Sequence, residues 1–325
     1  RSRGLGDVYK RQLINNSEKP IVFLFGPTAS GKTDLAINLA KKFPVELISV
    51  DSVMVYKDCD IGSAKPNKNV LAKYPHHLVD IICPNEVFTV ADFYRRSMEI
   101  IEITHNKNKL PIFVGGSMMY FKSLYTGIND LPERDQKFRD SLKKLKTNNK
   151  DFFLHEKLNQ IDPEYAKKIN KNDEIRIIRA LEVFEKSGKR MSEVFLDNNK
   201  DCLSNKFDVS QFCISIDRNI LHERIKTRLK KIIKQGLVDE AKNLLNKYDL
   251  DLNHPLRKSV NYKQAFEFIE KKHDHETFFD KALFATRQLA KRQTTWIRSW
   301  DKFKEIDLME PKVLENDVKK LITAL

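Results

Sequence analysis

The residues that point most directly to a chemistry are Gly26–Thr33, GPTASGKT, which fit the pattern GxxxxGK[ST] of a phosphate-binding loop. Its glycines allow backbone N–H groups to surround an anion at the start of a helix, where the helix dipole is positive. Lys32 is placed to neutralise phosphate oxygens, and the Thr33 hydroxyl is placed to bind Mg²⁺. The alternative is a glycine-rich turn that carries a surface lysine. The pattern predicts a phosphate or diphosphate site and leaves the reaction open.

Asp51 is the second candidate, because it directly follows the apolar run Val45–Val50. A carboxylate at the end of such a strand can hold Mg²⁺, as in a kinase, or take a proton from an incoming nucleophile. The alternative is an aspartate that stabilises a turn or a helix start. His76 and His77 follow, and nothing in their spacing indicates a metal site, so we expect ordinary loop histidines.

These residues need a sheet to position them, and short apolar runs predict strands at Ile21–Phe25, Val45–Val50, Pro111–Val114 and Phe212–Ile216. The alternation of strands with helices predicts an α/β fold: a P-loop NTPase-like parallel sheet flanked by helices. Open sheets of this kind bind ligands at the edge where the strands end, which is where Asp51 lies. The predicted helices are Thr33–Lys42, Asp92–His105, Ser117–Tyr125, Leu221–Gln235, Leu237–Lys247 and Thr277–Trp300.

A different pattern occupies the stretch from Gly127 to about Phe207, where strand-like runs disappear and charged helical segments replace them. We interpret this stretch as a helical insertion domain, in which Lys143–Lys150 and Leu196–Asp201 are expected to be solvated loops. The predicted division is a non-native or disordered flank at 1–19, an α/β core with a helical C-terminal part at 20–127 and 208–325, and the insertion at 128–207.

The composition narrows the class of protein. Lys and Arg number 59 against 45 Asp and Glu, and the formal net charge of +14 favours a polyanionic partner. No apolar run approaches the roughly 18 to 20 residues that a membrane span needs, so a membrane-spanning protein is excluded. The four cysteines form no CxxC pair, which indicates neither a zinc site nor a disulfide framework. We therefore expect a reduced, cytoplasmic protein.

Nine sequence blocks, taken in order, resemble the tRNA dimethylallyltransferase (tRNA isopentenyltransferase) family. The resemblance extends from about Pro20 to Trp300, and nine ordered blocks are far more specific than a phosphate loop alone. The blocks are GPTASGKT (26–33), ELISVDS (46–52), DIGSAKP (60–66), PHHLVDI (75–81), GGSMMYFKSL (115–124), LPERD (131–135), RIIRALEV (176–183), SGKRMSE (187–193) and ATRQLAKRQTTWIRSW (285–300).

The resemblance implies a reaction. The family transfers the dimethylallyl group of dimethylallyl diphosphate to N6 of adenosine 37, beside the tRNA anticodon. It implies that Asp51 is the general base, that Thr28 and Arg228 are catalytic, and that Arg228 contacts the diphosphate. It also implies Mg²⁺ as cofactor, with Thr33 as a ligand. The implied diphosphate-binding residues are Gly26, Pro27, Thr28, Ala29, Ser30, Gly31, Lys32 and Thr33.

The implied partner is the anticodon stem-loop of a tRNA, and we expect a monomer that binds no membrane. Ser117 stands where the family usually has a threonine near the reacting adenosine, and Arg139 matches a tRNA contact in the insertion. For Trp296 and Trp300 the alternative is packing between helices. The implied tRNA-binding positions are Asp51, Ser52, Val53, Met54, Ser117, Arg139, Ile175, Arg176, Ile177, Ile178, Arg179, Lys258, Ser259, Val260, Asn261, Tyr262, Lys263, Lys291, Arg292, Gln293, Thr294, Thr295, Trp296, Ile297 and Arg298.

Three positions depart from the family pattern. Asn261 replaces a glycine, and because asparagine tolerates a positive φ better than most residues, we expect the turn to survive. Lys263 replaces an arginine and loses its bidentate fork. Met54 stands where many members carry a glutamine. These changes affect the expected tRNA contacts and leave the expected chemistry intact.

Three other functions remain open at this point. A related enzyme could prenylate a free adenine nucleotide, although the insertion and the basic block at 285–300 favour tRNA. A phosphate-loop kinase would bind ATP tightly and transfer a phosphoryl group. An RNA-binding protein with a degenerate site is the third, and the presence of Lys32, Thr33, Asp51 and Arg228 argues against it.

Overall fold

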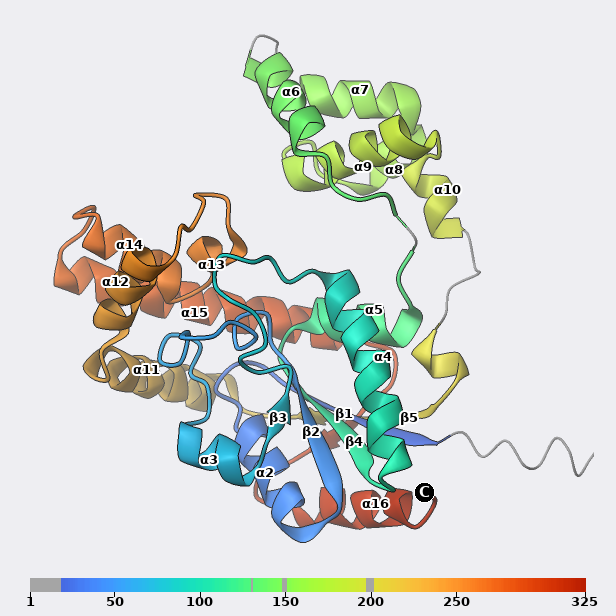
Figure 1. Ribbon diagram of the computed structural model, residues 1–325, viewed down its shortest axis with the longest axis vertical. Coiled ribbons are helices and arrows are strands. Elements are labelled where there is room, and N and C mark those ends of the chain that lie inside the picture. The colour runs from blue at the N-terminus through green and yellow to red at the C-terminus, as the bar shows by residue number, and fades with distance from the viewer. Residues whose placement is uncertain (1–18, 130, 148–150, 197–201) are drawn as a thin grey trace, which may run out of the picture. The chain divides into compact units, whose positions relative to one another are not determined.

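The computed structural model describes residues 19–129, 131–147, 151–196 and 202–325. The chain divides into two compact units, an α/β unit within 1–126 and 202–325 and a helical insertion within 127–201 (Figure 1). Nearly all of the predicted flank at 1–19 lies outside the described residues. None of the described helices combines the length and apolar composition that a membrane crossing requires.

A parallel sheet forms the centre of the α/β unit, with six strands in the order β3-β2-β4-β1-β5-β6. The four predicted strands are confirmed, although β5 begins and ends earlier than predicted. The sequence signal missed β3 and β6, which are too short to form a recognisable apolar run. The strands are β1 (Pro20–Phe25), β2 (Val45–Val50), β3 (His76–His77), β4 (Leu110–Gly115), β5 (Asp208–Ile214) and β6 (Lys304–Ile306).

Successive side chains along the strands pack alternately into two hydrophobic layers, one on each face of the sheet. Val22 and Leu24 of β1 pack with buried residues of α2 (Lys32–Lys42) and α16 (Lys312–Ile322). Phe23 and Phe25 join the opposite layer, which includes residues of α4 (Val90–Asn106), α5 (Met118–Thr126) and α15 (His275–Arg298). Because β1 is buried on both faces, the phosphate loop that follows it starts from a fixed point.

Further helices of the α/β unit lie between the strands and after β5. Most of them belong to the chain after β5, where they precede and flank α15 (Figure 1). The remaining elements of this unit are α3 (Lys68–Lys73), the 3₁₀ helix η1 (Leu203–Asn205), α11 (Arg218–Lys234), α12 (Leu237–Lys247), α13 (Pro255–Lys258) and α14 (Tyr262–Ile269).

The helical insertion has its own core, in which Leu142, Leu158 and Leu181 are buried. The prediction of a loop from Lys143 was wrong for its first part, because α6 continues to Thr147; residues 148–150 and 197–201 lie outside the described residues. The run of lysine and leucine favours a helix, and buried Leu142 anchors its last turns. The helices are α6 (Gln136–Thr147), α7 (Phe153–Ile161), α8 (Pro163–Lys168), α9 (Glu174–Ser187) and α10 (Met191–Leu196).

Candidate active site

The phosphate loop connects β1 to α2, so it lies at the carboxyl edge of the sheet and at the N-terminus of a helix. Ala29 and Gly31 adopt left-handed conformations, with φ of 62° and 97°. A side chain at Gly31 would also lie 3.0 Å from Leu308, so both conformation and space favour glycine there. The loop thus turns sharply and leaves the first N–H groups of α2 available to bind an anion.

Lys32 supplies a positive charge within this loop. Its Nζ donates a hydrogen bond to the Pro27 carbonyl oxygen at 3.1 Å, and among the described residues it forms no ion pair. Burial, helped by the nearby positive charge of Arg228, lowers the pKa of Lys32 to about 8. The fully buried Ser30 hydroxyl also lacks a hydrogen-bond partner in the described chain. A half-buried cation and a buried, unpartnered hydroxyl on one loop are the features that a bound anion would satisfy.

Helix α11 brings two arginines to the phosphate loop. Arg224 Nη1 donates to the Ser30 carbonyl oxygen at 3.3 Å. Arg228 Nη2 donates to the Ala64 carbonyl oxygen at 3.2 Å, and burial lowers the pKa of this guanidinium. Both contacts use neutral acceptors, so the arginine charges are not cancelled by these bonds.

Asp51 follows β2 on the same edge of the sheet. Its Oδ1 accepts hydrogen bonds from the backbone N–H of Val53 at 2.8 Å and of Met54 at 3.1 Å. The second oxygen, Oδ2, accepts none among the residues that the structure describes. Oδ1 therefore stabilises the turn, as the alternative reading of Asp51 predicts. Oδ2 is available to act as a base or as a metal ligand.

A cavity of about 440 Å³, here called the Asp51 cavity, joins these elements within the α/β unit. Its polar lining includes Thr28, Asp51, Ser117 and Arg228. The predicted residues Ala29, Ser52 and Val53 also line it. The apolar part of the wall is formed by Met118, Met119, Ile225, Leu229, Ile232, Leu289 and Trp296. The cavity lining thus combines charged groups with apolar side chains, which suits a molecule with an anionic head and an apolar tail.

Gln293 connects the walls of this cavity. Its Oε1 accepts the Thr28 backbone N–H at 2.8 Å, and its Nε2 donates to the Gly116 carbonyl oxygen at 2.9 Å. Both ends of the amide are therefore engaged inside the protein. The sequence assigned Gln293 to tRNA binding, and the structure places it as a brace between the phosphate loop and the segment after β4.

The end of α13 and the segment after it form another wall, in which Lys258, Ser259, Val260 and Asn261 line the cavity. Asn261 has a positive φ of 73° with ψ of −52°, so asparagine accommodates the positive φ at the position where the family has glycine. Tyr262 is fully buried, so it packs inside the protein. Lys263 is exposed, and its Nζ lies 3.8 Å from Glu267.

The basic block on α15 divides between different surroundings. Arg292, Gln293 and Trp296 line the Asp51 cavity. Ile297 is mostly buried. The ring centroids of Trp300 and Phe25 of β1 lie 5.5 Å apart, so Trp300 packs in the protein as the alternative predicts, although against the sheet. The packing alternative was wrong for Trp296, which is 39% exposed. The remaining predicted positions line a separate depression of about 820 Å³: Pro27, Lys291, Thr294, Thr295 and Arg298.

In the helical insertion, two of the predicted tRNA contacts serve the fold. Arg139 forms two hydrogen bonds of 2.7 Å with the carboxylate of Glu182, and Arg179 Nη1 donates to the same carboxylate at 2.6 Å. Burial opposes ionisation of Glu182, but the hydrogen bonds from Arg139, the Asp135 backbone and Arg179 lower its pKa to about 2. Ile177 and Ile178 are buried, whereas Ile175 and Arg176 are exposed.

The predicted Mg²⁺ ligand, Thr33, lies in the first turn of α2 beside Lys32. Within the described residues no group of three or more His, Cys, Asp or Glu could hold a metal ion. Mg²⁺ commonly keeps several waters and binds through one or two protein ligands plus substrate phosphates. The residues therefore fit an ion that arrives with a diphosphate, and they offer no preformed metal cage in the described part.

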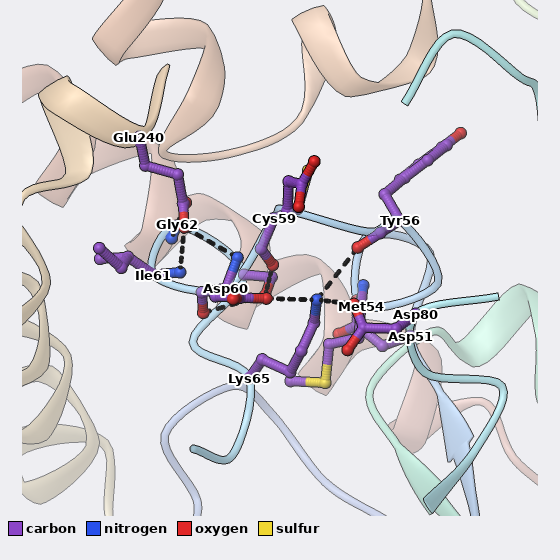
Figure 2. Close-up of polar contacts among 12 residues, drawn as sticks. Asp51, Met54, Tyr56, Cys59, Asp60, Ile61, Gly62, Lys65, Asp80 and Glu240 are labelled. Carbon is purple, nitrogen blue, oxygen red and sulfur yellow. Dashed lines mark hydrogen bonds and ion pairs between the residues drawn. The ribbon is translucent and has the colours of Figure 1, made fainter. Parts of the chain in front are cut away.

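Two charged residues next to the site were not assigned a role from the sequence, although DIGSAKP was noted as a motif. Lys65 Nζ donates to Asp60 at 2.8 Å, Asp80 at 2.5 Å and the Tyr56 carbonyl oxygen at 3.0 Å (Figure 2). Glu240, on α12, accepts backbone N–H groups of the loop that contains Asp60 (Figure 2). The contacts of Glu240 cannot be read from spacing, because its partners in this loop lie about 180 positions away.

The family model described as IPP transferase matches residues 54–300. A tRNA isopentenylpyrophosphate transferase from Bacillus halodurans is similar in structure, with 30% identity, a TM-score of 0.68, and coverage of 94% of this chain and 97% of that chain. A tRNA delta(2)-isopentenylpyrophosphate transferase from Staphylococcus epidermidis has 28% identity, a TM-score of 0.65 and coverage of 95% and 100%. A eukaryotic dimethylallyltransferase acting on tRNA has 27% identity, a TM-score of 0.75 and coverage of 89% and 74%.

Proposed function

Because the chain belongs to the IPP transferase family and is a prenyltransferase, we propose that it transfers the dimethylallyl group of dimethylallyl diphosphate to N6 of adenosine 37 in tRNA. The tRNA-acting proteins that it resembles support a tRNA acceptor. The choice of adenosine 37, of N6 and of Mg²⁺ rests on the sequence resemblance and on the chemistry of the site.

One observation carries the proposal: the Asp51 cavity combines a carboxylate, an arginine and an apolar wall at the end of a phosphate loop. Lys32 and Arg228 make hydrogen bonds to carbonyl oxygens rather than ion pairs within the described chain. Their charges therefore remain available for a diphosphate. The apolar wall suits a five-carbon tail and keeps water from the reacting carbon.

The donor binds with its diphosphate on the phosphate loop and its tail in the Asp51 cavity. When transfer occurs, the bond between C1 of the dimethylallyl group and the diphosphate oxygen breaks, and its electron pair stays on that oxygen. Lys32, Arg228 and backbone N–H groups stabilise the charge that develops there. Thr33 would hold Mg²⁺, which supplies further neutralisation of the diphosphate when bound.

The acceptor is an adenine that has left the anticodon stack, because N6 cannot reach the cavity from inside it. Its N6 lone pair is delocalised into the ring, so the amine is a weak nucleophile. Oδ2 of Asp51 accepts the N6 proton as the C–N bond forms. Arg292 and Trp296 lie at the cavity wall, where a cation can bind phosphate and an indole can stack on a base.

The test uses the purified chain, labelled dimethylallyl diphosphate, Mg²⁺ and a tRNA that carries adenosine 37. We expect label in the tRNA without ATP, and nucleoside analysis should locate it on N6 of adenosine 37. The same tRNA with guanosine 37 serves as the control and should remain unlabelled. AMP as acceptor distinguishes the nucleotide-prenylating alternative.

Transfer to AMP at a rate that matches transfer to tRNA would contradict the tRNA proposal. Phosphorylation of an acceptor by ATP without any prenyl transfer would show that the protein is a kinase and would overturn the proposal. Label on a nucleotide other than adenosine 37 would keep tRNA prenylation and correct the site.

A further inference from the structure

We infer that Glu240 is a positioning residue, which fixes the Cys59–Lys65 loop so that the Ala64 carbonyl group holds Arg228 beside the phosphate loop. The effect of Glu240 on prenyl-transfer kinetics rests on the proposed function. The geometry that supports it is internal to the α/β unit, and the donor side of the site can be tested with inorganic diphosphate alone.

The carboxylate of Glu240 accepts four hydrogen bonds. Oε2 accepts the backbone N–H of Asp60 at 2.9 Å and of Ile61 at 2.7 Å. Oε1 accepts the backbone N–H of Gly62 at 2.9 Å and the hydroxyl of Tyr262 at 2.7 Å. Hydrogen bonds to an ionised acceptor are stronger than neutral ones, so this residue replaces the partners that a regular strand or helix would provide. Figure 2 shows the side chain reaching the loop from outside it.

The same loop has a second anchor and a tight fit. Lys65 closes its far end: its side chain is only 1% exposed and bonds to Asp60 and Asp80. Burial alone would lower the pKa of Lys65, but these hydrogen bonds outweigh burial and raise it. At Gly62 a Cβ would lie 2.6 Å from the Tyr262 ring, so the loop backbone packs directly on that ring. Asn261 Nδ2 donates to the Gly62 carbonyl oxygen at 2.9 Å.

The loop held in this way touches the catalytic machinery. Gly62, Ser63 and Ala64 line the Asp51 cavity. Ala64 adopts a left-handed conformation with φ of 54°, and its carbonyl oxygen accepts Arg228 Nη2 at 3.2 Å. A shift of the loop therefore moves the acceptor that orients the guanidinium. Glu240 is not among the residues that line the Asp51 cavity, so it acts on Arg228 through the loop.

The test is a double-mutant cycle on Glu240→Gln and Arg228→Gln, read out as the dissociation constant for inorganic diphosphate in the presence of Mg²⁺. A glutamine has one acceptor oxygen, and its amide N–H₂ group would face loop N–H groups. We expect Glu240→Gln alone to weaken diphosphate binding about tenfold, the worth of one charge-assisted hydrogen bond. In the Arg228→Gln background it should have no further effect, since the two residues act through one contact.

Asp239→Asn is the matched control, because it removes the same charge from the neighbouring exposed position of α12. It should leave diphosphate affinity and both KM values unchanged. In prenyl transfer, Glu240→Gln should raise the KM for the donor more than the KM for tRNA, and Glu240→Asp should restore part of the loss. If Glu240→Gln does not fold, Glu240→Asp and Tyr262→Phe enter the same cycle.

Additive effects in the cycle, or unchanged diphosphate affinity with only a lower melting temperature, would show a purely structural role and overturn the inference. Failure of the proposed function gives a different result. In that case the wild-type chain transfers no prenyl group to tRNA, while the diphosphate cycle still shows coupling between Glu240 and Arg228.

Discussion

The α/β unit and the helical insertion use the same kinds of charged residue in opposite ways. In the insertion, Arg139 and Arg179 surround the carboxylate of Glu182, which has no exposed surface. In the α/β unit, Lys32 and Arg228 bond to carbonyl oxygens. Among the described residues neither of these two cations forms an ion pair. The first arrangement neutralises a buried carboxylate and ties α6 to α9, and the second keeps positive charge available for an anion.

The difference teaches that the chemistry of an arginine depends on which acceptor it meets. A carboxylate that receives two arginines is satisfied, and removal of one partner leaves a buried charge. A carbonyl oxygen orients a guanidinium without neutralising it. The same contrast separates the acids, because Glu182 uses both oxygens and Asp51 uses one.

The largest expected effect concerns the unused oxygen of Asp51. Asp51→Asn should slow prenyl transfer by about 10²- to 10⁴-fold, the usual worth of a positioned base, with little change in diphosphate affinity. Single-turnover transfer to tRNA measures the chemical step. Asp58→Asn, which removes an exposed carboxylate of the same segment, is the control. Loss of Mg²⁺-dependent diphosphate binding with an unchanged chemical step would make Asp51 a metal ligand.

The next largest effect is on stability and concerns Glu182, whose two carboxylate oxygens both accept hydrogen bonds. Glu182→Gln should destabilise the insertion by about 2 to 3 kcal/mol, because it leaves the half-buried Arg139 and Arg179 with a neutral amide in place of their shared carboxylate. Hydrogen exchange in peptides from the insertion measures this loss. Diphosphate affinity should stay unchanged. Both tryptophans, Trp296 and Trp300, lie in the α/β unit, so their fluorescence provides an internal reference. Equal destabilisation of both units would refute this separation.

A smaller effect follows from the lowered pKa of Lys32, which is about 8. A bound anion favours the charged lysine. Above pH 8 the free lysine is neutral, so binding must take up a proton, and diphosphate affinity should fall by up to about tenfold per pH unit. Below that value the contribution of Lys32 should be constant. In Lys32→Arg the side chain stays charged at every pH tested, so its diphosphate affinity no longer depends on protonation of residue 32. Any pH dependence that this variant keeps comes from the titration of diphosphate itself. Identical pH profiles for the two proteins would contradict the prediction.

The smallest effect is expected at Arg176, whose side chain is 62% exposed and meets only Asp173 in the described insertion, at 3.4 Å. Arg176→Ala should raise the KM for tRNA by about two- to fivefold and reduce the salt dependence of binding by about one phosphate contact. Titration of tRNA at several salt concentrations checks both. Lys167→Ala, at another exposed position of the insertion, should change neither. An unchanged salt dependence in Arg176→Ala would remove it from the tRNA interface.

The sequence predicts the sheet well where local signals suffice. Buried strands such as Ile21–Phe25 are continuous apolar runs, and the positive φ of Asn261 follows from the glycine that the resembling family has at this position. The short strands β3 and β6 carry no such signal. The polar partners of Glu240 and Gln293 cannot be predicted from the sequence either, because they lie far away along the chain. Before the fold is known, both residues have the pattern of ordinary surface positions on a helix. For the same reason Arg139 reads as a nucleic-acid contact, although its partner Glu182 stands 43 positions away.

The order of the strands in the sheet has a consequence for synthesis of the chain. β1 lies between β4 and β5, and the whole insertion is encoded between those two strands. While the ribosome adds the residues from Gly115 to Asp208, one side of β1 is an unpaired edge, for roughly 5 to 20 seconds at common elongation rates. Unpaired edges recruit other strands, so the nascent chain is exposed to mispairing throughout that interval. Slow translation of the insertion should therefore lower the yield of folded enzyme, and chaperones that bind extended segments should act before β5 emerges.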